Sequence, residues 1–162
     1  MTVRRTSVFP AGREAVFEKL WHLETLQFIA APYAAFEPAG EAVSVWTAGS
    51  RCSFRFRLFC FIPFGVHTIH IVQMDQDGIR SREGNRHVPV WNHWIRLRPL
   101  DGEHTEYTDE VEIWAGWKTV FVWLWAWAFY AHRQRKWIRM LKAEGIGESG
   151  VEQFAKALTL LV

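Results

Sequence analysis

The amino-acid sequence predicts an α+β fold in which one long C-terminal helix covers a curved, antiparallel sheet of seven strands. Three observations support this prediction. Residues 2–9 alternate polar and apolar side chains, as a half-buried strand does, and two short helical segments follow them. Between 42 and 113 the apolar residues recur at every second position. From 118 to about 142 the sequence has the length and pattern of a helix.

The first strand ends at a break that precedes the two short helices. Pro10 and Gly12 interrupt the alternation. From about 13 to 23, apolar residues recur at intervals of three and four while charged residues occupy the other side, which predicts a first helix. A second helix from 25 to 30 is expected to end before Pro32, because proline disfavours a helical conformation of the residue before it.

Turn-forming residues divide the region of period two into about six further strands. Breaks are expected at 48–50, 63–65, 75–78, 84–89 and 101–102. No repeat or linker interrupts the pattern, so residues 1–145 are predicted to form one domain, with Gly145 and Gly147 ending the long helix. The remaining segment, 146–162, is expected to form a short helix that packs on this domain.

The last two strands can be aligned from the sequence, because a short turn at 100–104 joins 91–99 to 105–113. If Leu100 pairs with His104, one face carries Trp91, Ile95, Leu97, Tyr107, Val111 and Ile113, and the other face carries charged pairs such as Arg98 with Glu106. His93 and Asp109 are then two polar residues on the apolar face, where they are diagonal neighbours within reach of each other.

The composition excludes several classes of protein. The 162 residues are 49% hydrophobic and 22% charged, with 19 basic and 17 acidic side chains, so neither a disordered chain nor a nucleic-acid-binding tail is indicated. Cys52 and Cys60 lie eight residues apart on one predicted extended segment, about 26 Å, which excludes a disulfide between them. No secretory signal begins the sequence, so free thiols and a cytoplasmic location are expected.

The long helix contains thirteen residues without a charge, 119–131, fewer than the roughly 20 that cross a bilayer. A buried or interfacial helix is therefore predicted. Its stripe at Val120, Leu124, Trp127, Ala131, Ile138 and Leu141 is expected to face the sheet. Phe121, Trp125 and Phe129 occupy another face. We expect the tail, a second copy of the chain (a homodimer) or a membrane surface, in that order of preference, to cover this aromatic face.

Four segments of the chain occur in an order that is known from other proteins. They are the strand end Phe9–Ala11 before the helix containing Val16–Phe17, the strand segments Ile62–His67 and Tyr107–Val111, and His132–Arg135 in the terminal helix. Over residues 2–142 this order resembles the START-like superfamily, also called SRPBCC. The resemblance implies a helix-grip fold, in which the sheet wraps around the terminal helix and leaves an apolar pocket between them. Members include lipid carriers, plant hormone receptors and aromatic-polyketide cyclases.

Motifs for other chemistries are missing from the sequence. It contains no CxxC, HExxH, GxGxxG, GxxxxGK or GxSxG pattern, so neither a metal nor a cofactor is expected. His67 and His70 have the spacing of a metal-binding pair on a helix. On a strand, however, side chains three positions apart point to opposite faces, which argues against a metal site built on these two residues.

The sequence thus predicts a domain that binds a small apolar or aromatic ligand, lipid-like or polyketide-like, with no assigned reaction. The expected cavity wall consists of Phe54, Phe56, Leu58, Trp91, Ile95, Tyr107, Val111, Leu124 and Trp127, with His93 and Asp109 as the polar groups that orient the ligand.

Two alternative functions remain open. One is a cyclase or dehydratase in which Asp109 holds His93 as a general base, although the same pair also suits a hydrogen-bonded element of the core. The other is a peripheral lipid-transfer module that inserts the turn Ile62–Phe64 and the aromatic helix face into a membrane surface.

Overall fold

The computed structural model describes residues 1–40 and 45–159, and residues 146–159 by their backbone alone. Within these residues, seven strands and three helices follow one another in the order predicted for an α+β fold. The second strand, however, lies at 34–38, before the region 42–113 that is expected to contain about six further strands, and the described part of that region contains five. The elements are β1 (Thr2–Phe9), α1 (Arg13–Leu20), α2 (Leu23–Ala30), β2 (Ala34–Pro38), β3 (Arg51–Leu58), β4 (Ile62–Asp75), β5 (Gly78–Gly84), β6 (Val90–Pro99), β7 (Thr105–Trp114) and α3 (Thr119–Thr159). The two short helices after β1 are where the sequence predicts them.

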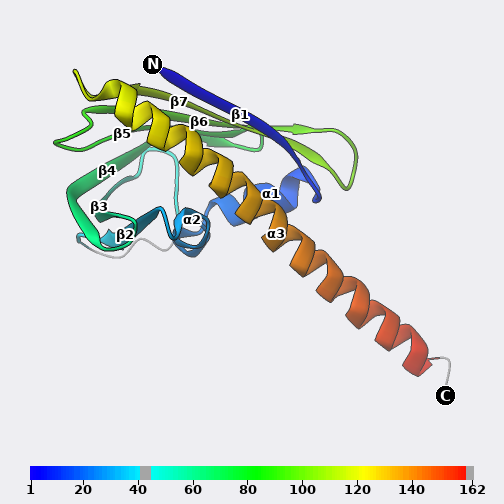
Figure 1. The fold of residues 1–162 in the computed structure, drawn as a ribbon. Helices are drawn as coiled ribbons and strands as arrows, with labels where there is room; N and C mark the ends of the chain where they lie inside the picture. Colours follow the sequence, from blue (N-terminus) through cyan, green and yellow to red (C-terminus); the bar gives the residue numbers. More distant parts are fainter. Residues whose placement is uncertain (41–44, 160–162) are drawn as a thin grey trace.

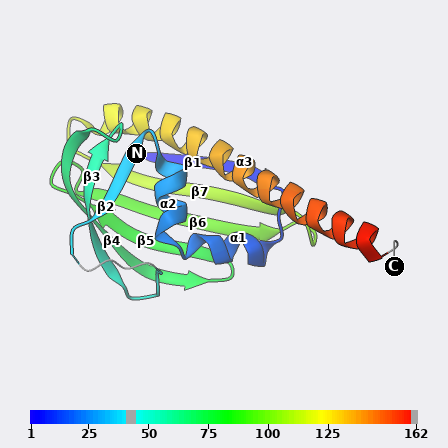
Figure 2. The ribbon, with the colours of Figure 1, turned by 90° about the horizontal axis from the view of Figure 1, so that it is seen from below.

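All seven strands form one antiparallel sheet in the order β1-β7-β6-β5-β4-β3-β2. After β1 the chain passes through α1 and α2 to the opposite edge, and it then returns strand by strand until β7 pairs with β1. Figures 1 and 2 show α3 running across this curved sheet, next to β1 and with α2 beside its middle part. This arrangement is the helix-grip fold.

The predicted register of the β6–β7 hairpin is confirmed. Leu97 lies opposite Tyr107, Ile95 opposite Asp109, His93 opposite Val111 and Trp91 opposite Ile113. The outer face carries the expected ion pair of Arg98 with Glu106, at 2.9 Å. A shift of one residue would have turned the apolar set to solvent, which is why the hydrophobic pattern is enough to set this register.

One predicted break is wrong. The chain turns at Phe59 and Cys60, both in the left-handed backbone region with φ of 52° and 66°, and β4 already begins at Ile62, so residues 63–65 belong to a strand. Proline is tolerated there because this first part of β4 pairs with β3 alone, and β5 joins only further along. The thiols of Cys52 and Cys60 are free, as predicted.

The prediction that the long helix ends at Gly145 is wrong. In the structure α3 continues to Thr159. A glycine in a helix interior costs only about 1 kcal/mol relative to alanine, and no proline follows to stop the helix. Figure 1 shows the last turns of α3 extending past the sheet. The side chains of 146–162 lie outside the described residues, and with them the predicted packing of this tail on the domain. In the part of the chain that the structure describes, no helix combines the length and hydropathy needed to cross a bilayer.

The predicted face of α3 is wrong in the first half of the helix. Val120, Leu124 and Trp127, expected against the sheet, are 52%, 54% and 53% exposed, whereas Ala131 and Leu141 of the same predicted stripe are buried. Beyond Thr119, the buried residues of the helix are Ala126, Phe129, Tyr130, Ala131, Arg133, Gln134, Trp137 and Leu141. Two features explain the error. The first three turns are apolar on every side, so periodicity does not select a face, and Arg133 with Gln134 gives the buried side a polar appearance in the sequence.

Candidate functional site

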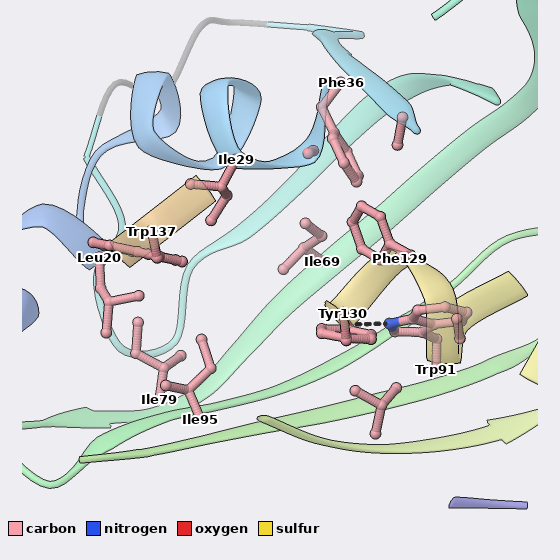
Figure 3. Close-up of a cluster of buried hydrophobic side chains, with 14 of the residues drawn as sticks. Leu20, Ile29, Phe36, Ile69, Ile79, Trp91, Ile95, Phe129, Tyr130 and Trp137 are labelled. Carbon is pink, nitrogen blue, oxygen red and sulfur yellow. Dashed lines mark hydrogen bonds between the residues drawn. The ribbon is translucent and has the colours of Figure 1, made fainter. Parts of the chain in front are cut away.

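A cavity of about 610 Å³ lies between the inner face of the sheet, α2 and the first half of α3. Its wall is mainly apolar. Figure 3 shows part of this wall, with Ile69, Ile79 and Ile95 on the sheet and Ile29 and Phe129 on the helices. A volume of this size is typical of sites that enclose a small organic molecule.

The cavity reaches the protein surface beside the start of α3. Trp117 and Phe121 both line it, yet they are 82% and 67% exposed. Trp125 and Phe129 continue the lining inward, with stacked rings whose centroids are 4.9 Å apart, and Trp125 lies 6.1 Å from Trp91 on β6. The aromatic helix face that was expected to need a cover is therefore turned toward the cavity, with Phe121 at its mouth.

The cavity wall also carries polar side chains. They are Thr25, His67, Ser81, Glu83, Asn85, His93, Lys118 and Arg133. The alternation of β5 explains two of them. Ser81 and Glu83 share the inner face of the sheet with Ile79, whereas Arg80 and Arg82 are exposed on the other face.

His67 and Glu83 form a buried pair whose proton positions follow from their partners. Asn85 Oδ1 accepts hydrogen bonds from the backbone N–H groups two and three residues further on, at 2.8 Å each. This orients the Asn85 amide so that its Nδ2 donates to His67 Nδ1, at 3.4 Å. Because Nδ1 is then an acceptor, the ring proton of His67 lies on Nε2, which donates to Glu83 Oε2 at 3.0 Å. Ser81 Oγ donates to the other carboxylate oxygen.

These contacts keep Glu83 ionised although its side chain is only 10% exposed. Burial raises the pKa of its carboxyl. The hydrogen bonds from His67 and Ser81, together with the attraction of the neighbouring imidazole rings of His67 and His93, lower this pKa by more than burial raises it. The pKa of Glu83 therefore lies below its ordinary value, and the cavity wall contains a carboxylate rather than a neutral acid.

Asp109 lies behind the wall with no exposed surface and accepts three hydrogen bonds. The donors are Tyr107 Oη at 3.2 Å, Gln134 Nε2 at 2.9 Å and His93 Nε2 at 2.8 Å. The diagonal contact that the sequence predicts between His93 and Asp109 is thus present. Burial raises the pKa of Asp109, but the guanidinium of Arg133 and the hydrogen bond from His93 lower it by more, so that this carboxyl is also ionised.

Arg133 brings a positive charge to the same region. Its side chain lines the cavity and is 6% exposed, its Nη2 donates to Tyr107 Oη at 3.4 Å, and its Nε lies 4.0 Å from Asp109 Oδ1. Burial lowers the pKa of the guanidinium, and the hydrogen bond to Tyr107 and the negative charge of Asp109 raise it by more, so the group stays charged. Its Nε is buried without a hydrogen-bond partner among the described residues, which leaves the guanidinium with unused donor capacity.

His93 connects the two buried carboxylates. Its Nε2 donates to Asp109, whereas its Nδ1 lies 3.8 Å from Glu83 Oε1, too far for a hydrogen bond, and bonds to no other described residue. The wall therefore offers a carboxylate, an imidazole nitrogen and a guanidinium to the cavity, and such groups can bind a hydroxyl or carbonyl. Over residues 1–40 and 45–145, no three His, Cys, Asp or Glu side chains are grouped to hold a metal ion.

The structure brings about half of the predicted wall residues to the cavity. Those that line it are Phe56, Leu58, Trp91, His93 and Ile95. Phe54, Tyr107, Asp109 and Val111 are buried behind the wall and are not part of the lining. The prediction that Leu124 and Trp127 line the cavity is wrong, because both lie on the solvent-facing side of α3.

Of the eight polar residues of the wall, the sequence predicts His93 as a site residue and not the other seven, among them Ser81, Glu83 and Arg133. The alternation Ile-Arg-Ser-Arg-Glu at 79–83 was a usable signal, because two arginines at alternate positions of a strand place the serine and the glutamate on the apolar side. Arg133 gave no such signal, since its neighbours at 132–136, His-Arg-Gln-Arg-Lys, resemble an exposed helix end.

Comparison with known proteins supports the fold. No family model and no curated protein sequence matches the chain. Three similar solved structures are protein CV1439 from Chromobacterium violaceum (13% identity, TM-score 0.71, 86% of this chain and 96% of that chain), a START superfamily protein from Mycobacterium smegmatis (13%, 0.68, 88% and 97%) and the Zhui aromatase/cyclase from Streptomyces sp. R1128 (16%, 0.58, 89% and 92%). At these identities the likeness shows the fold alone, and that fold is START-like.

We expect Asp109→Asn to lower the free energy of unfolding at neutral pH by about 3–5 kcal/mol, because Arg133 loses its buried counter-charge. The folded pKa of Asp109 is depressed below the unfolded value of about 3.9. Its stabilisation is therefore present above that pH and is lost as pH falls through the folded pKa. The variant should accordingly lose less stability than the wild type between about pH 5 and pH 2. Urea unfolding across this range measures both effects.

Glu106→Gln is the matched control. Glu106 lies on the same strand as Asp109, and it forms an exposed ion pair with Arg98. It should leave the stability at neutral pH almost unchanged. An Asp109→Asn protein as stable as the wild type at neutral pH would contradict the buried network described above.

Proposed function

We propose that the protein binds a small apolar or aromatic molecule in the cavity, with a hydroxyl or carbonyl group of that molecule at the polar part of the wall. The observation that carries this proposal is an apolar cavity of about 610 Å³ whose lining includes the buried, ionised carboxylate of Glu83. Small-molecule sites combine a largely apolar lining with a few polar groups that set the orientation of the ligand. A START superfamily protein and an aromatase/cyclase share the fold.

The position of Glu83 supports a function in binding rather than in stability. Transferring a carboxylate from water to a protein interior costs several kcal/mol, and well-packed hydrophobic residues often stabilise a core as well as a buried ion pair does. His67 and Ser81 compensate part of this cost, yet Glu83 still lines an open cavity. A ligand group that donates a hydrogen bond to this carboxylate would compensate more of it.

The polar groups also restrict which ligand fits best. Glu83 and the Nδ1 nitrogen of His93 offer acceptors, whereas Arg133 offers a donor. A hydroxyl group can donate to one of the first two and accept from the third, and a carbonyl can accept from the guanidinium. We therefore infer that a ligand with one such group binds more tightly than a hydrocarbon of the same shape.

Ile79→Trp should weaken the binding of 1-N-phenylnaphthylamine, an aromatic probe whose fluorescence rises in apolar surroundings. Ile79 lines the cavity, and the larger side chain removes room and contact area from the probe. A loss of about 40–60 Å² of buried apolar area predicts a dissociation constant raised about fivefold or more. Fluorescence titration measures this constant.

Arg80→Trp is the control, because residue 80 is the exposed neighbour of Ile79 on the same strand. It should change the dissociation constant by no more than about twofold. Equal affinities of the wild type and Ile79→Trp would place the probe outside the cavity and count against the proposal.

The second candidate function is general-base catalysis, and the position of His93 favours it. His93 lines the cavity, Asp109 holds its Nε2 proton, and its Nδ1 has no hydrogen-bond partner among the described residues. A histidine held in this way by a carboxylate can remove a proton from a bound substrate. A cyclase or dehydratase acting on a polyketide-like substrate would need such a group.

If His93 is a base, the protein should speed hydrogen–deuterium exchange at the acidic methylene of 1-phenylbutane-1,3-dione. His93→Gln should then reduce the protein-catalysed rate at least about 100-fold while the affinity for the same compound stays within about twofold. Proton NMR in D2O, corrected for exchange in buffer, measures the rate. Exchange at the buffer rate in both proteins would leave binding as the function.

A further inference from the structure

The solvent-facing side of α3 is apolar in its first half and basic further along. Trp117, just before the helix, and Val120, Phe121, Leu124 and Trp127 within it are each more than half exposed. With about 3.6 residues per turn, their spacing places them on one side of the helix. An exposed apolar patch of this kind marks an interaction surface on a monomeric protein.

The same side of α3 becomes basic after this apolar half. Arg135, Arg139 and Lys142 are exposed, and Arg135 follows Leu124 by eleven residues, about three turns, so the two lie on the same side. None of these three basic side chains forms a salt bridge with another described residue. The sequence from 113 to 143 contains no Asp or Glu. We call the five apolar and three basic residues together the outer stripe.

The outer stripe is continuous with the mouth of the cavity. Trp117 and Phe121 belong to the stripe and also line the cavity, and Lys118 lies between them in the lining. Phe61 adds a further exposed apolar side chain, 73% exposed, in the turn between β3 and β4, the two strands that contribute Leu58 and Phe64 to the cavity lining.

We propose that the outer stripe docks the protein on a membrane surface that carries anionic headgroups, with the cavity mouth next to the bilayer. The charge pattern selects this occupant. Exposed aromatic and aliphatic side chains beside basic residues that have no salt-bridge partner among the described side chains, with no acidic residue among them, complement apolar acyl chains under anionic headgroups. A second copy of the chain would bring the same stripe, which has no carboxylate to pair with the basic half.

Docking in this position would let an apolar ligand pass between the bilayer and the cavity without crossing water. This role in ligand transfer rests on the proposed function. Tryptophan suits such a position, because its ring is apolar and its N–H group can bond to water or headgroups. Trp117 and Trp127 would lie at the interface, and Arg135 and Arg139 would contact headgroups.

Co-sedimentation with lipid vesicles tests the docking. The wild-type protein should bind vesicles of about three parts phosphatidylcholine to one part phosphatidylglycerol at least about tenfold more tightly than phosphatidylcholine vesicles, because each basic residue near an anionic surface adds about 1 kcal/mol. Leu124→Ser with Trp127→Ser should weaken binding to the mixed vesicles at least about tenfold. Arg135→Glu with Arg139→Glu should remove the preference for the anionic lipid.

Matched variants distinguish the stripe from composition and net charge. Leu100→Ser with Trp21→Ser removes residues of the same types with exposures of 46% and 38% elsewhere on the surface. Arg51→Glu with Arg55→Glu changes the net charge by the same amount as the Arg135 and Arg139 reversals, on exposed positions of β3. Both controls should bind mixed vesicles within about twofold of the wild type.

The proposal is overturned if the wild-type protein shows no preference for anionic vesicles, or if the Leu124 and Trp127 variant binds them as the wild type does. Sedimentation velocity without lipid identifies the competing occupant. A wild-type dimer that becomes a monomer in this variant, without loss of vesicle binding, would assign the stripe to a second copy. Titration with 1-N-phenylnaphthylamine in the absence of vesicles separates the two proposals, because retained probe binding without vesicle binding rejects the docking and leaves the cavity function intact.

Discussion

A carboxylate without solvent contact must receive hydrogen bonds from its surroundings, and Asp109 receives them from more than one layer of the fold. His93 donates to it from the neighbouring strand, and Gln134 donates to it from α3. Gln134 also donates to the backbone carbonyl of Arg5, at 3.0 Å, and accepts a hydrogen bond from Ser7, at 2.8 Å, both on β1. These bonds join α3 to three adjacent strands, and they set the rotation of the helix about its own axis.

The two surfaces of functional interest follow from that rotation. With Gln134 turned inward, the helical repeat brings Ala126 and Trp137 to the core, and Trp125 with Phe129 to the cavity. The opposite side of the same turns then lies in solvent, and it carries the apolar half of the outer stripe. The helical part of the cavity wall and the outer stripe therefore both follow from the rotation of α3 that the contacts of Gln134 set.

The sequence predicts the sheet better than it predicts the helix. A strand has two faces, and in the β6–β7 hairpin the apolar residues fit only one register, so the contact between His93 and Asp109 follows from the hydrophobic pattern alone. In a helix whose first turns are apolar on every side, the hydrophobic pattern does not show which face is buried. The rotation of α3 depends instead on Gln134, whose partner Asp109 is 25 positions away in the sequence. The polar wall was missed for a related reason, because Glu83 and His67 meet only when β4 and β5 pair.

Our main conclusion is that two histidines are held in fixed proton arrangements by the buried carboxylates, which leaves the cavity with an ordered polar end. Nitrogen-15 NMR of the imidazole rings of His67 and His93, in the ligand-free protein at neutral pH, tests it. We predict a proton on Nε2 and a bare Nδ1 in His67, and a proton on Nε2 in His93. A proton on Nδ1 of His67, or a bare Nε2 in His93, would contradict this conclusion.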